Sequence, residues 1–140
     1  MKITEDTYRS YELEILDLTN VFRVSKGVST LTWNDQAAVA ARLHSADMAA
    51  QNYFEHNNLE GKTPGDRMAA QGLISFKAWG ENIAAGHTNA IDAHYGWINS
   101  LGHRVNLLRG EYTWLGVGVK RAEENSKYGI YYTQNFYTPL

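Results

Sequence analysis

Apolar side chains recur at helical spacing in the first part of the chain. In the first such segment, acidic residues come early and Arg23 and Lys26 come late, an order that suits the helix dipole. Gly27 is expected to end this helix. The apolar positions on its predicted inner face are Tyr11, Ile15, Leu18 and Phe22.

A long alanine-rich helix is predicted next. A short extended piece at 28–33 precedes it, and Asn34 or Asp35 is expected to cap its first turn. The helix should run to about Asn52. Its many alanines predict that another element packs closely against it.

Two further helix starts follow. The segment 63–66 places Thr at the N-cap, Pro at N1 and Asp at N3, with Gly72 expected just after the helix. Thr88 or Asn89 opens a fourth helix that should end at Gly102. The residues predicted on one face of this fourth helix are Ile91, Tyr95 and Ile98.

The pattern changes to a period of two near the C-terminus. Apolar residues alternate with glycine or lysine over 115–120, which is typical of a half-buried strand. A polar turn at 122–127 and a β-rich run at 128–136 complete a predicted antiparallel hairpin. The glycines predict a close neighbour on one face. Residues 1–140 therefore read as one α+β domain, with helices layered on a small antiparallel sheet.

Composition excludes several classes of protein. The 140 residues are 44% hydrophobic and carry 13 basic against 15 acidic side chains, so no basic excess exists to bind nucleic acid. The sequence contains no run of about 18 apolar residues, so no membrane span is predicted. The absence of cysteine excludes disulfides, thiolate zinc sites and a cysteine nucleophile. No apolar segment of a signal peptide stands at the N-terminus.

Three polar positions stand out once the standard catalytic motifs prove absent. His56 enters a polar loop after the long helix, and His103 lies near a predicted helix end. Glu81 is predicted in a turn after Trp79, where desolvation could raise the pKa of its carboxyl. Each alone is also explained as a solvated or capping residue. The remaining histidines are interpreted as packing residues, His44 and His94, and a surface-turn residue, His87.

Six short sequence motifs, called phrases below, occur in an order that resembles the CAP superfamily. This superfamily includes cysteine-rich secretory proteins, antigen 5 and plant pathogenesis-related 1 proteins. The resemblance covers essentially the whole chain and is strongest to the cysteine-free bacterial branch of extracellular SCP-domain proteins. The phrases are Asn52-Tyr53-Phe54-x-His56, Gly61-Lys62-Thr63-Pro64-x-Asp66-Arg67, Gly80-Glu81-Asn82-Ile83-Ala84, Trp97-x-Asn99-Ser100-x-Gly102-His103-Arg104-x-Asn106-Leu107-Leu108, Gly116-Val117-Gly118-Val119 and Tyr132-Thr133-Gln134-Asn135-Phe136.

The resemblance implies a three-layer α-β-α sandwich with the hairpin central. It also implies secretion or cell-surface exposure, with a leader or neighbouring domain outside this stretch. Family members line a central cleft with two histidines and two glutamates, and some bind a divalent metal there. The matching residues here are His56, His103 and Glu81. Ser100 stands where the second glutamate would follow Trp97, so the set of four is incomplete.

Three chemical roles remain open for these residues. His56, His103 and Glu81 could bind Zn²⁺ weakly and reversibly, with loss of binding as the imidazoles protonate below pH ~6.5. They could instead act in acid–base catalysis, with Glu81 as the acid and a histidine as the base. Alternatively they form a structural network. Ser100 and Asn82 are expected to line the cleft, across which His56 and His103 should face each other.

The favoured function is therefore a binding module, monomeric, at the cell envelope or outside the cell. Its ligand would be an envelope component, a peptide or a small lipid-like molecule. A hydrolase of peptide or peptidoglycan is the alternative. Three polar residues of the quoted phrases are interpreted as scaffold, namely Arg104, Asn106 and Gln134.

Overall fold

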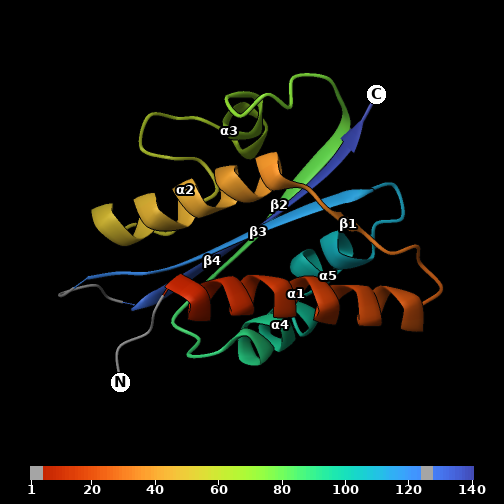
Figure 1. Ribbon diagram of the computed structural model, residues 1–140, viewed down its shortest axis with the longest axis horizontal. Helices are drawn as coiled ribbons and strands as arrows, with labels where there is room; N and C mark the ends of the chain where they lie inside the picture. The colour runs from red at the N-terminus through yellow and green to blue at the C-terminus, as the bar shows by residue number, and fades with distance from the viewer. Residues whose placement is uncertain (1–4, 124–127) are drawn as a thin grey trace.

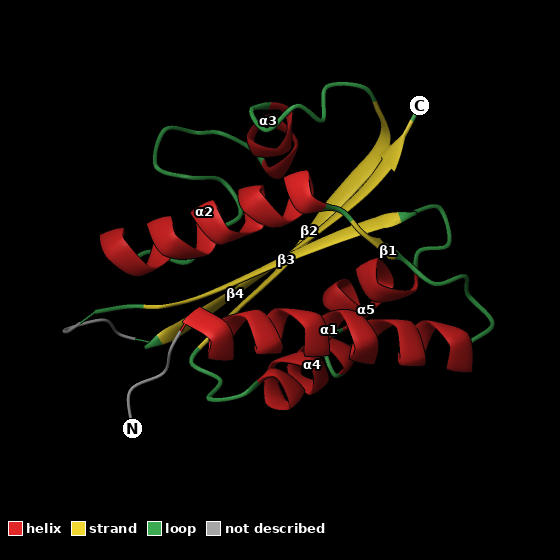
Figure 2. Ribbon diagram, in the orientation of Figure 1, coloured by secondary structure: helices red, strands yellow, loops and turns green. Residues whose placement is uncertain are grey.

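A four-stranded sheet lies between two layers of helices in the computed structural model, which describes residues 5–123 and 128–140 (Figures 1 and 2). The strand order is β1-β3-β4-β2; only the short β1 pairs in parallel, with β3. Helices α2 and α3 cover one face, and α1, α4 and α5 cover the other. The elements are α1 (Glu5–Ser25), β1 (Thr32–Trp33), α2 (Asp35–Gln51), α3 (Pro64–Ala69), β2 (Phe76–Ala85), α4 (Ala90–Ile98), α5 (Leu101–Leu108), β3 (Trp114–Arg121) and β4 (Ile130–Pro139).

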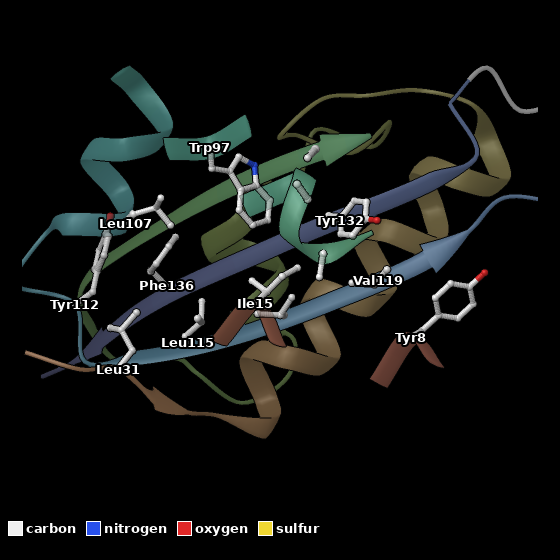
Figure 3. Packing of buried hydrophobic residues seen from close by; sticks show 14 of the residues in the cluster. Tyr8, Ile15, Leu31, Trp97, Leu107, Tyr112, Leu115, Val119, Tyr132 and Phe136 are labelled. Atoms are coloured by element: carbon white, nitrogen blue, oxygen red, sulfur yellow. The ribbon is translucent and has the colours of Figure 1, made fainter. Parts of the chain in front are cut away.

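The predicted hairpin is confirmed as the centre of this sandwich. β3 and β4 pair in antiparallel register from Trp114↔Tyr137 to Arg121↔Ile130. Nearly all of β4 is buried, because helices cover both of its faces. Aromatic and aliphatic side chains of β3 and β4 pack there with Ile15 and Trp97 (Figure 3). Of the predicted turn at 122–127, residues 124–127 lie outside the described part.

Helix α2 touches the backbone of β3, as its alanines and the strand glycines predicted. A Cβ atom added to Gly116 would lie 2.1 Å from the amide nitrogen of Ala38. A Cβ atom on Gly118 would lie 2.1 Å from the amide nitrogen of Arg42. Only glycine therefore lets the helix approach this closely. Asn34 is the N-cap, since its side chain accepts a hydrogen bond from the Ala37 amide.

The inner face of α1 differs from the apolar face that its sequence predicts. Glu12, Thr19 and Arg23 are buried on it beside Ile15, whereas Leu18 is only partly covered. A residue-by-residue apolar pattern cannot show this, because buried polar groups resemble surface positions until their partners are known.

The buried polar groups of α1 tie the layers together. The Arg23 guanidinium donates to backbone carbonyls of Ser29 at 2.6 Å and of Leu107 at 2.8 Å. Glu12 accepts from Arg42 on α2 at 2.8 Å and from the Val119 amide on β3 at 3.1 Å. Each polar group thereby offsets its desolvation with hydrogen bonds.

Two predicted features were wrong. The predicted turn at Glu81 lies within β2, which is buried on both faces and so shows no alternating pattern. The predicted fourth helix is two helices with a break at Asn99 and Ser100, and Gly102 lies inside the second. Ile91 and Tyr95 are exposed, because α4 buries its alanines and Trp97 instead.

The outer edge of β2 is held by side chains from α4, from α5 and from the loop that follows α5. The carbonyl oxygens of three alternate β2 residues each accept one hydrogen bond. This arrangement fixes α4 and α5 against the strand that carries Glu81. The bonds run from Tyr112 Oη to Trp79 at 3.2 Å, from Asn106 Nδ2 to Glu81 at 3.1 Å and from Trp97 Nε1 to Ile83 at 3.0 Å.

Substituting Gly116→Ala should destabilise the protein by about 3 kcal/mol, because backbone atoms of α2 cannot move aside as a flexible side chain would. The melting temperature should fall by roughly 10 °C in a thermal unfolding scan. Gly110→Ala is the matched control, since nothing lies within 4 Å of an added Cβ there. Equal melting temperatures for the two variants would contradict the close packing of α2.

Candidate functional site

Glu81 is the buried centre of the candidate site. Its side chain is 1% exposed, and both of its carboxylate oxygens have a partner. Oε1 accepts a hydrogen bond from His56 Nδ1 at 2.9 Å, and Oε2 accepts one from Arg67 Nη2 at 2.9 Å. The burial expected for this carboxylate is thus present, but in the form of a charged and hydrogen-bonded cluster.

Arg67 reaches Glu81 because of the way α3 begins. Thr63 and Asp66 form a capping box: the Asp66 amide donates to Thr63 Oγ1 at 3.1 Å, and the Thr63 amide donates to Asp66 Oδ2 at 3.0 Å. The backbone of Gly65 rests on Trp79 of β2, since an added Cβ would lie 2.5 Å from its indole nitrogen. The next turn therefore directs Arg67 onto the strand.

The imidazole of His56 is hydrogen-bonded to Glu81 on one side and open to solvent on the other. Helix α2 ends with Asn52 in the left-handed conformation, and the chain then carries His56 over Glu81. Arg67 Nη2 also donates to the His56 carbonyl at 2.6 Å. The imidazole is 52% exposed, as its loop sequence predicted. Its hydrogen bond to Glu81 raises the pKa of His56 above its ordinary value, outweighing partial burial.

His103 reaches the same strand from the opposite layer, in the first turn of α5. Its Nδ1 is hydrogen-bonded to Ser100 Oγ at 2.9 Å, so the serine that departs from the family pattern contacts this ring. Burial, and then the charge of His56, lower the pKa of His103. The two rings are close enough to interact electrostatically; that they face each other across a cleft stays a prediction.

Asn82 supports His103 from within the protein. It is fully buried, and strand alternation turns it to the sheet face opposite Glu81. Asn82 Nδ2 donates to the His103 carbonyl at 3.2 Å and to Gln134 Oε1 at 3.1 Å, while its Oδ1 accepts from Asn106 at 3.0 Å. Asn82 is therefore placed to position His103 rather than to touch a ligand. The same bonds explain Asn106 and Gln134 as scaffold residues.

The two histidines differ in charge over one range of pH. At pH values above the lowered pKa of His103 and below the raised pKa of His56, His103 is neutral and His56 is protonated. Protonated His56, a positively charged hydrogen-bond donor, and the neutral imidazole of His103 then lie on opposite sides of β2. Such a pair can bind a polar ligand or transfer protons.

The three expected zinc ligands each make hydrogen bonds within the protein. Both oxygens of Glu81 are engaged, one of them by the cationic Arg67, and His103 Nδ1 is engaged by Ser100. In residues 5–123 and 128–140, no three His, Asp or Glu side chains are grouped so that they could hold a metal. The zinc site therefore stays a prediction.

Arg67 is the site residue that sequence reasoning missed. In the sequence Arg67 stands out only as part of a family motif, although its side chain is 10% exposed and binds both Glu81 and the His56 backbone. Fourteen residues separate it from Glu81 (81 − 67). The capping box just before it was the available signal, because that motif fixes the direction of the first helical turn.

Comparison with known proteins assigns this chain to one protein family. The sequence model of the family described as "CAP: Cysteine-rich secretory protein family" matches residues 16–136, and the chain belongs to this family. The extracellular SCP-domain protein of Bacillus anthracis is 38% identical, with a TM-score of 0.84, over 99% of this chain and 45% of that one. An outer surface protein of Borrelia burgdorferi, 21% identical with a TM-score of 0.78 over 100% of this chain and 97% of its own, shows the same fold.

Two curated relatives come from Bacillus subtilis. The uncharacterized membrane protein YlbC is 45% identical over 125 residues, which are 89% of this chain and 34% of YlbC. The uncharacterized protein YkwD is 36% identical over 127 residues, 91% of this chain and 47% of YkwD. The chain thus spans between a third and a half of these relatives. Across the described residues, no helix combines the length and apolar character needed to cross a membrane.

Replacing Glu81 by Gln should return the pKa of His56 toward its ordinary value, because the carboxylate that favours the imidazolium is removed. The pKa of His103 should rise in the same variant, since His56 carries less charge at a given pH. Titration of the histidine Cε1 protons by NMR measures both. Glu111→Gln, at a carboxylate paired with Arg109, is the control. Unchanged titration of His56 in Glu81→Gln would contradict the described contact.

Proposed function

We propose that this CAP domain is a ligand-binding module of an exported protein and that it acts at the cell envelope or outside the cell. Its ligand contacts the exposed ring of His56 and the neighbouring His103. The observation that carries the proposal is the half-exposed imidazole held by a carboxylate and a guanidinium that are almost entirely buried.

The energetics of the cluster support a role in function. Burying Glu81 and Arg67 costs desolvation energy that their attraction only partly offsets, so the pair is a poor source of stability. What the pair does provide is a fixed orientation and a defined charge for His56. A surface group that is oriented before a ligand arrives loses little side-chain entropy on binding.

The chemistry of the site favours a polar ligand. A protonated His56 donates to anionic or carbonyl oxygens, and a neutral His103 can both donate and accept. Peptidoglycan carries carboxylate, amide and hydroxyl groups close together, which makes this envelope polymer a better match than a lipid-like molecule. The extracellular and outer-surface descriptions of the B. anthracis and B. burgdorferi proteins support the location.

His56→Ala should weaken binding to purified Bacillus subtilis cell walls by about 10-fold, the effect of losing one charge-assisted hydrogen bond. Wild-type binding should be stronger on the acid side of the raised His56 pKa and decline as pH rises through it. A co-sedimentation assay at several pH values measures both effects. His87→Ala is the matched control. Binding that is equal in both variants and independent of pH would refute the proposal.

A hydrolase is the second candidate, and the opposite pKa shifts of the two histidines favour it. In an amide hydrolysis, neutral His103 would take a proton from the attacking water and protonated His56 would give one to the leaving nitrogen. Glu81, with both oxygens engaged and 1% exposed, would position and charge His56 rather than act as the acid itself.

If the hydrolase hypothesis holds, Glu81→Gln should lower the release of soluble fragments from peptidoglycan by about 100-fold, a typical contribution of general acid catalysis. The acid-to-neutral pH profile should also narrow, because His56 loses its proton at lower pH. Mass spectrometry of the released fragments gives the rate. No release by the wild-type protein from either peptidoglycan or peptides would exclude this candidate.

A further inference from the structure

A pocket of about 280 Å³ is lined by residues of α2, of α3 and of the loop that joins them. Its polar lining includes His44 and Asp47 from α2, Asn58 and Glu60 from the loop, and Arg67 from α3. Arg67 is shared between the pocket and the Glu81–His56 cluster. A molecule in the pocket would therefore lie against a residue that orients the exposed histidine.

Two almost fully buried side chains that line the pocket have hydrogen-bonding atoms without a partner. Arg67 uses Nη2 for Glu81 and His56, but its Nε and Nη1 bind nothing. His44 donates from Nε2 to the Glu55 carbonyl at 2.8 Å, which leaves Nδ1 as an unused acceptor. A buried polar group without a hydrogen-bond partner leaves its desolvation uncompensated. A ligand that satisfies these atoms would compensate that desolvation.

The charges around the pocket define the complementary ligand. Arg67 offers N–H donors for a carboxylate or carbonyl oxygen. Asp47 and Glu60 bring negative charge, and each carboxylate oxygen of Asp47 accepts one hydrogen bond and keeps a second lone pair. With the acceptor on His44, the pocket offers sites for an ammonium group beside sites for a carboxylate.

The loop wall of the pocket is preformed. Asn58 Oδ1 accepts hydrogen bonds from the backbone amides of Glu60 at 3.0 Å and Lys62 at 2.9 Å. The backbone amide of Asn58 donates to the Lys62 carbonyl at 3.0 Å. These bonds hold Glu60 in place opposite the helices before anything binds. Pre-organisation of this kind favours recognition of small polar ligands.

We propose that this pocket binds a zwitterionic α-amino acid head group, with its carboxylate on Arg67 and its ammonium on Asp47 and Glu60. The head group belongs either to a free amino acid or to a diamino acid side chain of an envelope peptide. In the second case the rest of the ligand continues to His56, a step that rests on the proposed function.

Calorimetry and histidine NMR with alanine, N-acetylalanine and alanine amide test the head group. Alanine should bind with a dissociation constant of about 1 mM, and each blocked analogue should bind about 10-fold more weakly because one charged contact is lost. Binding should also shift the His56 ring resonance through Arg67. Equal binding of the three compounds, or no binding up to about 20 mM, would overturn the proposal.

Variants locate the site. Glu60→Gln, at an exposed side chain, should weaken alanine binding about 5-fold, whereas Glu111→Gln should not. The double variant Arg67→Gln with Glu81→Gln avoids leaving one buried charge unpaired and should abolish binding. An unaltered affinity in the double variant would overturn the assignment.

Two further experiments distinguish the free amino acid from the envelope peptide, and the pocket proposal from the proposed function. Tighter binding of γ-glutamyl-diaminopimelic acid than of alanine would identify the envelope peptide, and equal affinity would identify the free amino acid. Alanine should still bind to His56→Ala. If cell-wall binding does not depend on His56 while alanine binds, the proposed function fails and the pocket stands. If cell-wall binding depends on His56 but alanine does not bind, the proposed function stands and the pocket proposal fails.

Discussion

The contact of α2 with the bare backbone of β3 is the constraint on which the rest of the molecule depends. Gly116 and Gly118 remove the side chains that would otherwise separate helix and sheet. The C-terminal end of α2 is thereby set at a fixed height above the sheet, and the chain that leaves it carries His56 to Glu81. If α2 sat higher by the thickness of a side chain, a hydrogen bond of 2.9 Å could not form.

Buried polar groups, rather than apolar packing alone, set the relation between the layers. Arg23 joins the end of α1 to the end of α5, and Glu12 joins α1 to α2 and β3. Asn82 and Glu81 extend this principle to adjacent positions of β2, one serving each face. The candidate site is thus continuous with the polar framework of the fold, which keeps its histidines in place.

Local signals carried the successful predictions. The helix start at Thr63, the alanine-rich helix and the terminal hairpin each follow from residues close in sequence, whereas His56, Glu81 and His103 come from the family resemblance and stay predicted site residues. What failed depends on distant partners. β2 shows no alternation because helices cover both faces, and the buried role of Arg67 requires Glu81 fourteen residues away (81 − 67). A short stretch of chain shows neither the helices that cover β2 nor the partner of Arg67; the capping box before Arg67 indicates only the direction of its helical turn.

The side-chain bonds along the outer edge of β2 have a consequence for the behaviour of the molecule in a crowded surrounding. An edge strand with unpaired carbonyls can recruit a strand from another molecule and seed aggregation. Trp97, Asn106 and Tyr112 occupy the carbonyls that such a strand would use. Side chains of α4, of α5 and of the loop after α5 thus also block intermolecular strand pairing at this edge, which favours a protein that remains dispersed at high local concentration.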